Sequence, residues 1–266
     1  MDQNVITRVG GSLMNVNSYV VESADSLVVV DGMLTLSDAR AVRRRIDEAR
    51  KPLRGLIVTH AHPDHYAGAA EILRGLDDVP ILATPPVKRI IERDDAVKDR
   101  IVGPMMGNEW PPSRRFPDRV VTEAIDLGDL TFRVRDLGPG ESPADSVWSL
   151  DERTLFVGDL VYNGMHAYLA DGLFTEWLAV LARLETELDP DATLYVGHGQ
   201  PAGPGLIATQ RRYIEAFLEA VDQNRRLDPD ARRAAVVNTM KRVLPTEELL
   251  FLMELSVDPV ASAQGA

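Results

Sequence analysis

One stretch decides the fold: Thr59-His60-Ala61-His62-Pro63-Asp64-His65 places three imidazoles and one carboxylate within six consecutive positions. It follows directly after the apolar run Leu56-Ile57-Val58, which is typical of a buried strand. Neutral imidazole and carboxylate are ligand types for zinc, iron and manganese. The stretch therefore predicts a metal site at the end of a strand. The alternative, a run of polar residues in a surface loop, explains the clustering much less well.

The same arrangement recurs further along the chain. A helical pattern begins at Tyr66, so the histidine cluster lies at a junction between strand and helix, where α/β folds usually bind ligands. Three more predicted strands, 130–134, 155–157 and 193–196, are followed by Glu141, Asp159 and His198 respectively. We expect these side chains to lie near the cluster.

The predicted elements indicate a pair of sheets covered on the outside by helices. Alternating or continuous apolar runs punctuated by turn residues predict further strands, and apolar residues at helical spacing predict the helices. The early strands are expected over 5–9, 15–22, 26–31 and 81–83, and the helices over 37–51 with Ser37 as its cap, 85–93, 176–188, 206–227 and 230–255.

The segment 94–118 interrupts this regular pattern. It contains Gly103-Pro104, Met105-Met106 and Trp110-Pro111-Pro112, and the Gly and Pro residues favour breaks in long regular elements. We expect a lid-like excursion over the site. Its Met and Trp side chains either cap an apolar substrate or pack on the body as satellite core.

Composition restricts the function classes. The 266 residues, 45% of them hydrophobic, are enough for a single domain over 1–266. A net charge of −12 argues against a nucleic-acid or anionic-membrane partner, and the absence of cysteine excludes thiolate metal sites. The polar start and the lack of a long apolar run favour a cytoplasmic location.

These motifs resemble the metallo-β-lactamase fold superfamily. His60-Ala61-His62-Pro63-Asp64-His65 matches the family's His-x-His-x-Asp-His motif residue for residue. Val30-Asp31-Gly32 comes before this motif, and Leu155 to Asp159 and Val196 to Gly199 come after it, all in the family's order, so the likeness covers about residues 5–220. It implies an αββα sandwich of two mixed sheets, here with extra C-terminal helices over 205–256.

The resemblance also implies a site for two divalent metal ions, with zinc preferred and iron or manganese as alternatives. His60 and His62 would hold the first ion, Asp64, His65 and His198 the second, and Asp159 would bridge them. Such a pair can lower the pKa of a shared water and polarise a carbonyl oxygen. The implied function is a metal-dependent hydrolase that uses a metal-bound hydroxide on a small ester, thioester, lactone or amide.

One position departs from the family pattern. The middle motif usually reads Gly-His-Thr/Ser-Pro-Gly, but here it reads Gly140-Glu141-Ser142-Pro143-Ala144, with glutamate in place of the ligand histidine. Glu141 either binds the first ion through oxygen, which would favour harder ions, or leaves the first site incomplete. Asp145 is the alternative ligand if Glu141 points away.

Other residues receive roles around this centre. The catalytic candidates are Asp64, as a ligand of the second ion, and His166, on the loop that leaves Asp159. His166 acts either as a substrate-side acid or as a structural histidine. Asp31 matches a family aspartate that supports the metal loop, and Tyr162, Asn163 and Tyr168 are weaker candidates.

Two other functions stay open: an iron-dependent, dioxygenase-like oxidoreductase on the same fold, and a metal-binding protein with one degenerate site. The expected partner is a small-molecule substrate. The apolar run Leu249 to Met253 must pack on its own body or on a partner, so a homodimer through the C-terminal helices is the alternative to a monomer.

Overall fold

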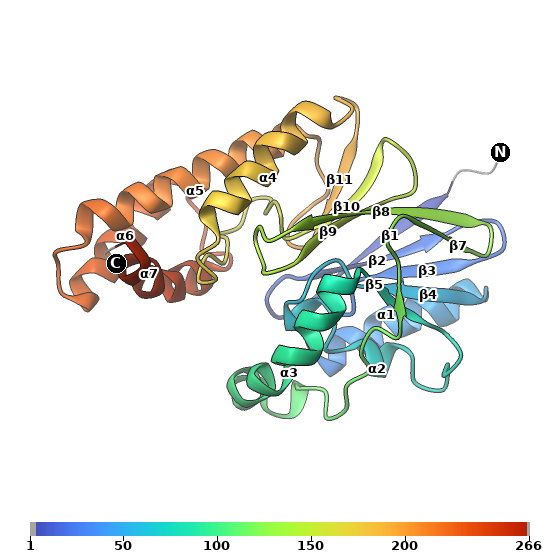
Figure 1. The fold of residues 1–266 in the computed structure, drawn as a ribbon. Coiled ribbons are helices and arrows are strands. Elements are labelled where there is room, and N and C mark those ends of the chain that lie inside the picture. Colours follow the sequence, from blue (N-terminus) through green and yellow to red (C-terminus); the bar gives the residue numbers. More distant parts are fainter. Residues whose placement is uncertain (1–3, 265–266) are drawn as a thin grey trace.

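The computed structural model describes residues 4–264 and contains two mixed β-sheets that face each other between layers of helices (Figure 1). The first sheet has the order β1 (Val5–Gly10), β2 (Asn17–Glu22), β3 (Leu27–Val30), β4 (Leu53–Ile57), β5 (Ile81–Ala83), β6 (Arg119–Val120). β1 to β3 pair antiparallel, and β3 to β6 pair parallel.

The second sheet has the order β11 (Thr193–Val196), β10 (Thr154–Gly158), β9 (Asp145–Ser149), β8 (Leu130–Gly138), β7 (Ala124–Leu127). Only the β10–β11 pair is parallel. The carboxyl ends of these two strands therefore point the same way, which brings the residues that follow them to one edge.

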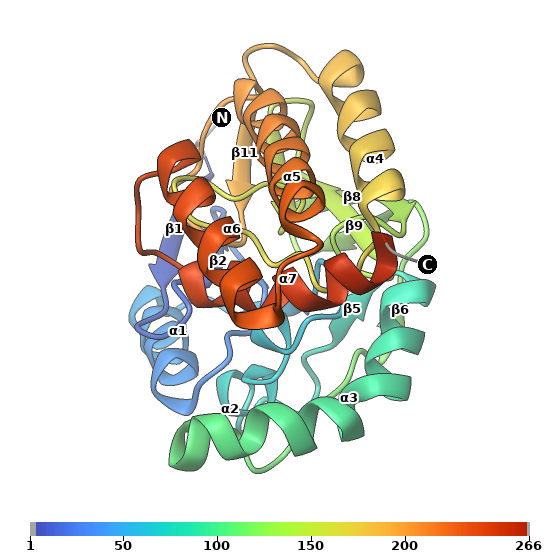
Figure 2. The same cartoon turned by 90° about the vertical axis from the view of Figure 1, so that its left-hand side faces the viewer.

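Helices cover the outer face of each sheet. α1 (Leu36–Ala49), α2 (Ala69–Ile72) and α3 (Pro85–Met106) lie on the first, and α4 (Phe174–Glu187) and α5 (Gly205–Asn224) lie on the second (Figure 1). Beyond α5 the chain adds α6 (Pro229–Val243) and α7 (Leu250–Gln264), which Figure 2 shows beside the end of α5. The predicted αββα sandwich with additional C-terminal helices is confirmed.

The central strand β3 packs against apolar residues on both of its faces. Val28 and Val30 point into the layer between the sheets, where they join Trp148 and Phe156. Their neighbours on β3 point outward into a second cluster beneath α1 and α2. A strand buried on both faces reads as a continuous hydrophobic run, as β3 does.

The predictions for α1 and α3 were wrong in their limits. α1 begins after Thr35, whose hydroxyl accepts a hydrogen bond from the Asp38 amide, so Thr35 and not Ser37 is the cap. α3 continues through segment 94–106 and contains Pro104 in its last turn, where the missing N–H leaves one i→i−4 hydrogen bond unmade. It ends at Gly107, which has a φ of 55°.

The C-terminal apolar segment packs on its own body. Met253, Val257 and Val260 are fully buried in the cluster that also contains Phe217 of α5 and Met240 of α6. The helix predicted over 230–255 is two helices, because residues 244–249 are not helical, and the second of them, α7, continues to Gln264. Among the described residues, no helix combines the length and apolarity needed to span a membrane.

This packing predicts that alanine substitutions at Met253, which is buried, and at Leu255, which is exposed, change the free energy of unfolding by different amounts. Met253→Ala should lower the free energy of unfolding by about 2–5 kcal/mol, because it leaves a cavity in the core. Leu255→Ala, at a position that is 57% exposed, should change it by less than about 0.5 kcal/mol. Urea denaturation would measure both, and equal effects would contradict the described packing.

Candidate metal centre

The ligand-type side chains come from four chain segments that meet at one edge of the sandwich. The histidine stretch follows β4 and turns through the short 3-10 helix Pro63–His65. Glu141 lies in the connection from β8 to β9, Asp159 directly follows β10, and His198 lies two residues beyond β11. The structure thus brings together the seven side chains predicted as metal ligands: His60, His62, Asp64, His65, Glu141, Asp159 and His198.

The first cluster consists of His60, His62, Glu141 and Asp159, whose donor atoms lie within 4.8 Å of one another. Glu141 Oε2 is 3.1 Å from His62 Nδ1 and 3.7 Å from His60 Nε2. Glu141 therefore points toward both imidazoles of the cluster. One ion could contact two imidazoles and two carboxylates here.

The second cluster consists of Asp64, His65, Asp159 and His198, also with donor atoms within 4.8 Å. His198 Nε2 lies 3.2 Å from Asp64 Oδ2 and 3.1 Å from Asp159 Oδ2, and His65 Nε2 lies 3.3 Å from Asp159 Oδ1. Asp159 belongs to both clusters. Its carboxylate can therefore contact two ions at once.

Unpartnered buried atoms support a fit to metal ions. His60 Nε2 and Glu141 Oε2 in the first cluster, and His65 Nε2 and Asp159 Oδ1 in the second, are buried without a hydrogen bond among the described residues. Buried polar atoms normally have a partner, and these four turn toward the other donors of their own cluster. The residues present therefore fit two cations chemically.

Each of the four histidines is oriented by a contact from its other ring nitrogen. This arrangement fixes the tautomer and leaves the remaining nitrogen free for a metal. The contacts are His60 Nδ1 with the Thr59 hydroxyl at 3.1 Å, His62 Nε2 with Asp171 Oδ2 at 3.1 Å, His65 Nδ1 with Asp31 Oδ2 at 2.9 Å, and His198 Nδ1 with the Met14 carbonyl at 2.9 Å.

Two carboxylates support the loop that carries the first three histidines. Asp31 also accepts a hydrogen bond from the Thr59 amide, as its predicted supporting role requires. Asp171 was missed in the prediction from sequence, because no motif surrounds it and it lies 109 positions from His62. Its contact with His62 depends on the loop fold rather than on a local pattern.

Tyr162 holds the unusual glutamate in place. Its hydroxyl lies 3.0 Å from Glu141 Oε1 and 2.9 Å from Asp159 Oδ2, and its ring stacks on His198 with centroids 5.2 Å apart. Burial raises the pKa of Tyr162 far above its usual range, so the phenol keeps its proton and remains a donor. This leaves Glu141 Oε2 for a metal.

The charge state of the metal-free centre follows from burial and neighbouring charges. Burial raises the pKa of Glu141 to about 7 despite the nearby His62. Burial and the charge of His65 lower the pKa of His60, which favours the neutral imidazole that binds metal. A cation would displace the proton that Glu141 holds near neutral pH.

Asp145 is placed elsewhere. Its two carboxylate oxygens accept hydrogen bonds from the Ser142 amide and hydroxyl, each at 3.0 Å, and it belongs to neither cluster. It stabilises the turn that presents Glu141. The structure thus gives Asp145 a supporting contact and not the alternative ligand position.

His166 lies outside the centre. Its Nδ1 is 2.8 Å from the Tyr213 hydroxyl, its Nε2 is 3.2 Å from the Thr246 carbonyl, and its side chain is fully buried. These contacts leave neither ring nitrogen for a substrate. His166 therefore has the structural role, which was one of the two predicted alternatives. The other alternative, a substrate-side acid, was wrong.

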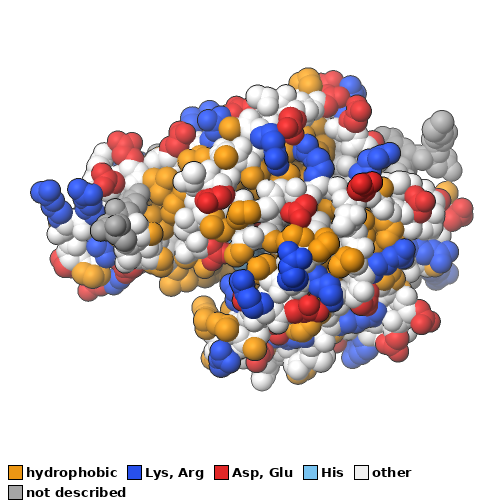
Figure 3. All heavy atoms as spheres, viewed as in Figure 1, with side chains coloured by type: hydrophobic (Ala, Val, Ile, Leu, Met, Phe, Trp, Pro, Cys, Tyr) orange, Lys and Arg blue, Asp and Glu red, His pale blue; other side chains and the backbone are white. Residues whose placement is uncertain are grey.

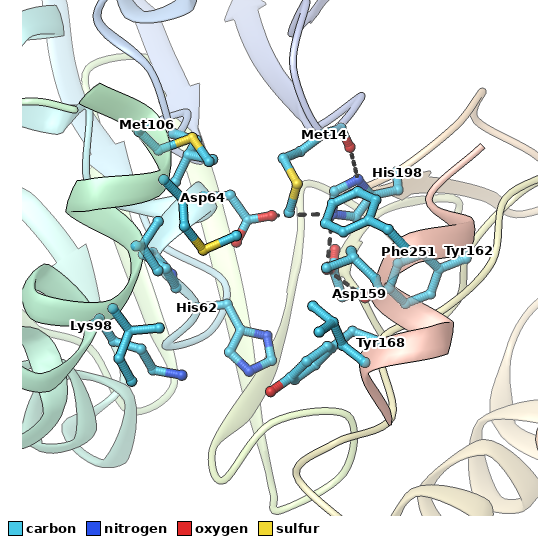
Figure 4. Close-up of a pocket in the computed structure, with 17 residues that line it drawn as sticks. Met14, His62, Asp64, Lys98, Met106, Asp159, Tyr162, Tyr168, His198 and Phe251 are labelled. Atoms are coloured by element: carbon cyan, nitrogen blue, oxygen red, sulfur yellow. Dashed lines mark hydrogen bonds and ion pairs between the residues drawn. The ribbon is translucent and has the colours of Figure 1, made fainter. Parts of the chain in front are cut away.

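One of the two roles considered for the expected lid is found, that of lining the cavity. Met105 and Met106 line the cavity beside the metal centre (Figure 4). Trp110 contacts its own segment, with the Arg114 guanidinium 4.1 Å from its ring centroid and its N–H donated to Asp99. Of the weaker candidates, Tyr162 and Tyr168 line this cavity, whereas Asn163 donates to the Gln200 carbonyl.

The sequence of the chain is similar to that of known proteins. The profile described as the metallo-beta-lactamase superfamily matches residues 11–199. A 2,4-dinitroanisole O-demethylase subunit alpha from Nocardioides sp. is 27% identical, over 82% of this chain and 61% of that protein. A hydroxyacylglutathione hydrolase from Prochlorococcus marinus is 25% identical, over 74% of this chain and 69% of that protein.

Solved structures agree in fold. A metallo-beta-lactamase family protein from Thermus thermophilus aligns with a TM-score of 0.68 at 18% identity, covering 99% of this chain and 94% of its own. A beta-lactamase domain protein from Burkholderia ambifaria aligns with a TM-score of 0.66 at 21% identity, covering 98% and 86%.

The contacts of Tyr162 predict that its hydroxyl strengthens metal binding at the first cluster. Tyr162→Phe should weaken metal binding there about 10–100-fold, because Glu141 Oε1 and Asp159 lose the donor that orients them. Isothermal titration of metal-free protein with zinc would measure it. Tyr195→Phe, at a tyrosine of β11 that belongs to neither cluster, serves as the matched control, and equal affinities in both variants would contradict the role given to Tyr162.

Proposed function

The chain belongs to the metallo-β-lactamase superfamily, and on that premise we propose that it is a metal-dependent hydrolase of a small ester, thioester, lactone or amide. The observation that carries the proposal is the pair of buried clusters that share Asp159. The relative named hydroxyacylglutathione hydrolase supports hydrolysis as the reaction class.

We assign the ligands as the two clusters suggest. His60, His62 and Glu141 would hold the first ion, and Asp64, His65 and His198 the second, with Asp159 in contact with both. Two divalent ions so held would lower the pKa of water and polarise the carbonyl oxygen of a substrate. Zinc is the preferred ion, with iron or manganese as alternatives.

The chain's own residues would orient the reaction. Asp64 lines the cavity as well as the second cluster, so its carboxylate would face the substrate. Tyr162 and Tyr168 also line the cavity, and Tyr168 meets the His62 ring edge-on with centroids 5.5 Å apart.

A second candidate function is an iron-dependent oxidoreductase. Its support is the first cluster, where two imidazoles and two carboxylates form an oxygen-rich donor set that suits iron better than three imidazoles would.

Metal content and turnover would separate these functions. Protein purified without added metal should contain two equivalents of zinc per chain and should hydrolyse esters or thioesters. Chelation should abolish the activity, and zinc should restore it, while Asp64→Asn should lose it. A single equivalent of iron with oxygen consumption, and no hydrolysis after zinc loading, would contradict the hydrolase and support the oxidoreductase.

Glu141 predicts a further difference in metal affinity. Glu141→His should keep the fold and raise the affinity for a first zinc, because imidazole is the usual third ligand and carries no charge. Glu141→Gln should lower it, since the amide retains the shape but loses the anionic donor. Competition with a chromophoric chelator would measure both, and unchanged stoichiometry and affinity in both variants would count against Glu141 as a ligand.

A further inference from the structure

A cavity of about 240 Å³ opens directly onto the metal centre (Figure 4). Its floor contains ligand-type residues of both clusters: His62, Asp64, Asp159 and His198. Its walls come from two helices far apart in sequence, α3 and α7. A molecule in the cavity would therefore contact the metal centre and both helices at once.

Each wall carries an apolar stripe at helical spacing, and the α3 wall also contains the charged side chain of Lys98. Ile101 and Met105 lie four positions apart on α3, and Phe251 and Leu255 lie four positions apart on α7. Residues at this spacing share one face of a helix. Figure 3 shows hydrophobic side chains on both sides of the hollow between the end of α3 and the C-terminal helices.

These wall residues are unusually exposed for their type. Ile101 is 60%, Met105 61%, Phe251 44% and Leu255 57% exposed. Contiguous exposed apolar residues commonly mark a ligand groove or an interface. Because these four line one cavity, they form a single surface rather than scattered exceptions.

The α7 wall is held rigidly against the body. Met253 and Val257 bury its opposite face, the Leu169 amide donates to the Ser256 hydroxyl at 2.9 Å, and the His166 amide donates to the Glu248 carbonyl at 3.0 Å. The His166 ring also contacts the Thr246 carbonyl. His166 thereby helps to position the helix that forms one wall of the cavity.

Building on the proposed hydrolase function, we propose that the substrate carries an apolar arm, alkyl or aryl, that lies between α3 and α7. The carbonyl end of the substrate would lie on the floor, against the metal ligands. Continuity of the walls with the metal centre favours a substrate over a second copy of the chain. Methionine side chains at Met105 and Met106 adapt to flexible apolar groups.

Binding of neutral amides of two lengths tests the arm directly. Hexanamide should bind at least about tenfold more tightly than acetamide, because each buried methylene adds several-fold to affinity. Titration calorimetry would be done on metal-free and on zinc-loaded protein. The preference is expected in both states, since the walls do not depend on the metal.

Matched variants locate the effect. Ile101→Asp and Leu255→Asp should each abolish most of the length preference and should lower the ratio of kcat/KM for 4-nitrophenyl hexanoate over acetate. Val243→Asp on α6 should leave both unchanged, because this exposed valine does not line the cavity.

The outcomes separate this proposal from the hydrolase itself. A length preference in binding without hydrolysis of any ester would sink the hydrolase and keep the apolar arm. No length preference in either metal state would overturn the arm, whatever the activity. A dimer in sedimentation that Leu255→Asp dissociates, together with no length preference, would assign the surface to a second copy and also overturn it.

Discussion

Four imidazoles and three carboxylates buried in mutual contact are the constraint on which the rest of this structure depends. Burying so many ionisable groups without a cation is costly, so the surrounding chain must hold them against their preference for water. Thr59, Asp31, Asp171 and the Met14 carbonyl do this by contacting the second nitrogen of each histidine. The two sheets supply the strand ends from which the ligands project.

Glutamate in the middle motif changes this balance. Glu141 adds a third carboxylate to the centre, which should weaken both ions as Lewis acids compared with an all-histidine first site. Tyr162 limits the disturbance, because its hydroxyl engages Glu141 Oε1 and leaves Oε2 directed at the two imidazoles. Because Tyr162 holds Glu141 toward the two imidazoles, we expect the first site to bind an ion with altered chemistry and not to be lost.

Much of this could be predicted from local sequence, because a strand followed directly by ligand-type residues places them at a sheet edge. The histidine stretch, Asp159 and His198 were found in this way. Contacts between residues far apart in sequence could not be predicted in this way. Asp171, for example, contacts His62 from a loop that carries no motif. The cavity walls likewise come from helices about 150 positions apart. The length of α3 was missed because Gly103-Pro104 was read as a break, although the helix runs through both residues to Met106.

The most direct measurement of the central claim is a crystal structure of zinc-loaded protein with anomalous data at the zinc edge. Two peaks about 3.5–4 Å apart are expected, one in each cluster, with Asp159 in contact with both. Glu141 Oε2 should lie about 2.0–2.2 Å from the first peak. A single peak in the second cluster, with Glu141 turned away from the histidines, would contradict the assignment.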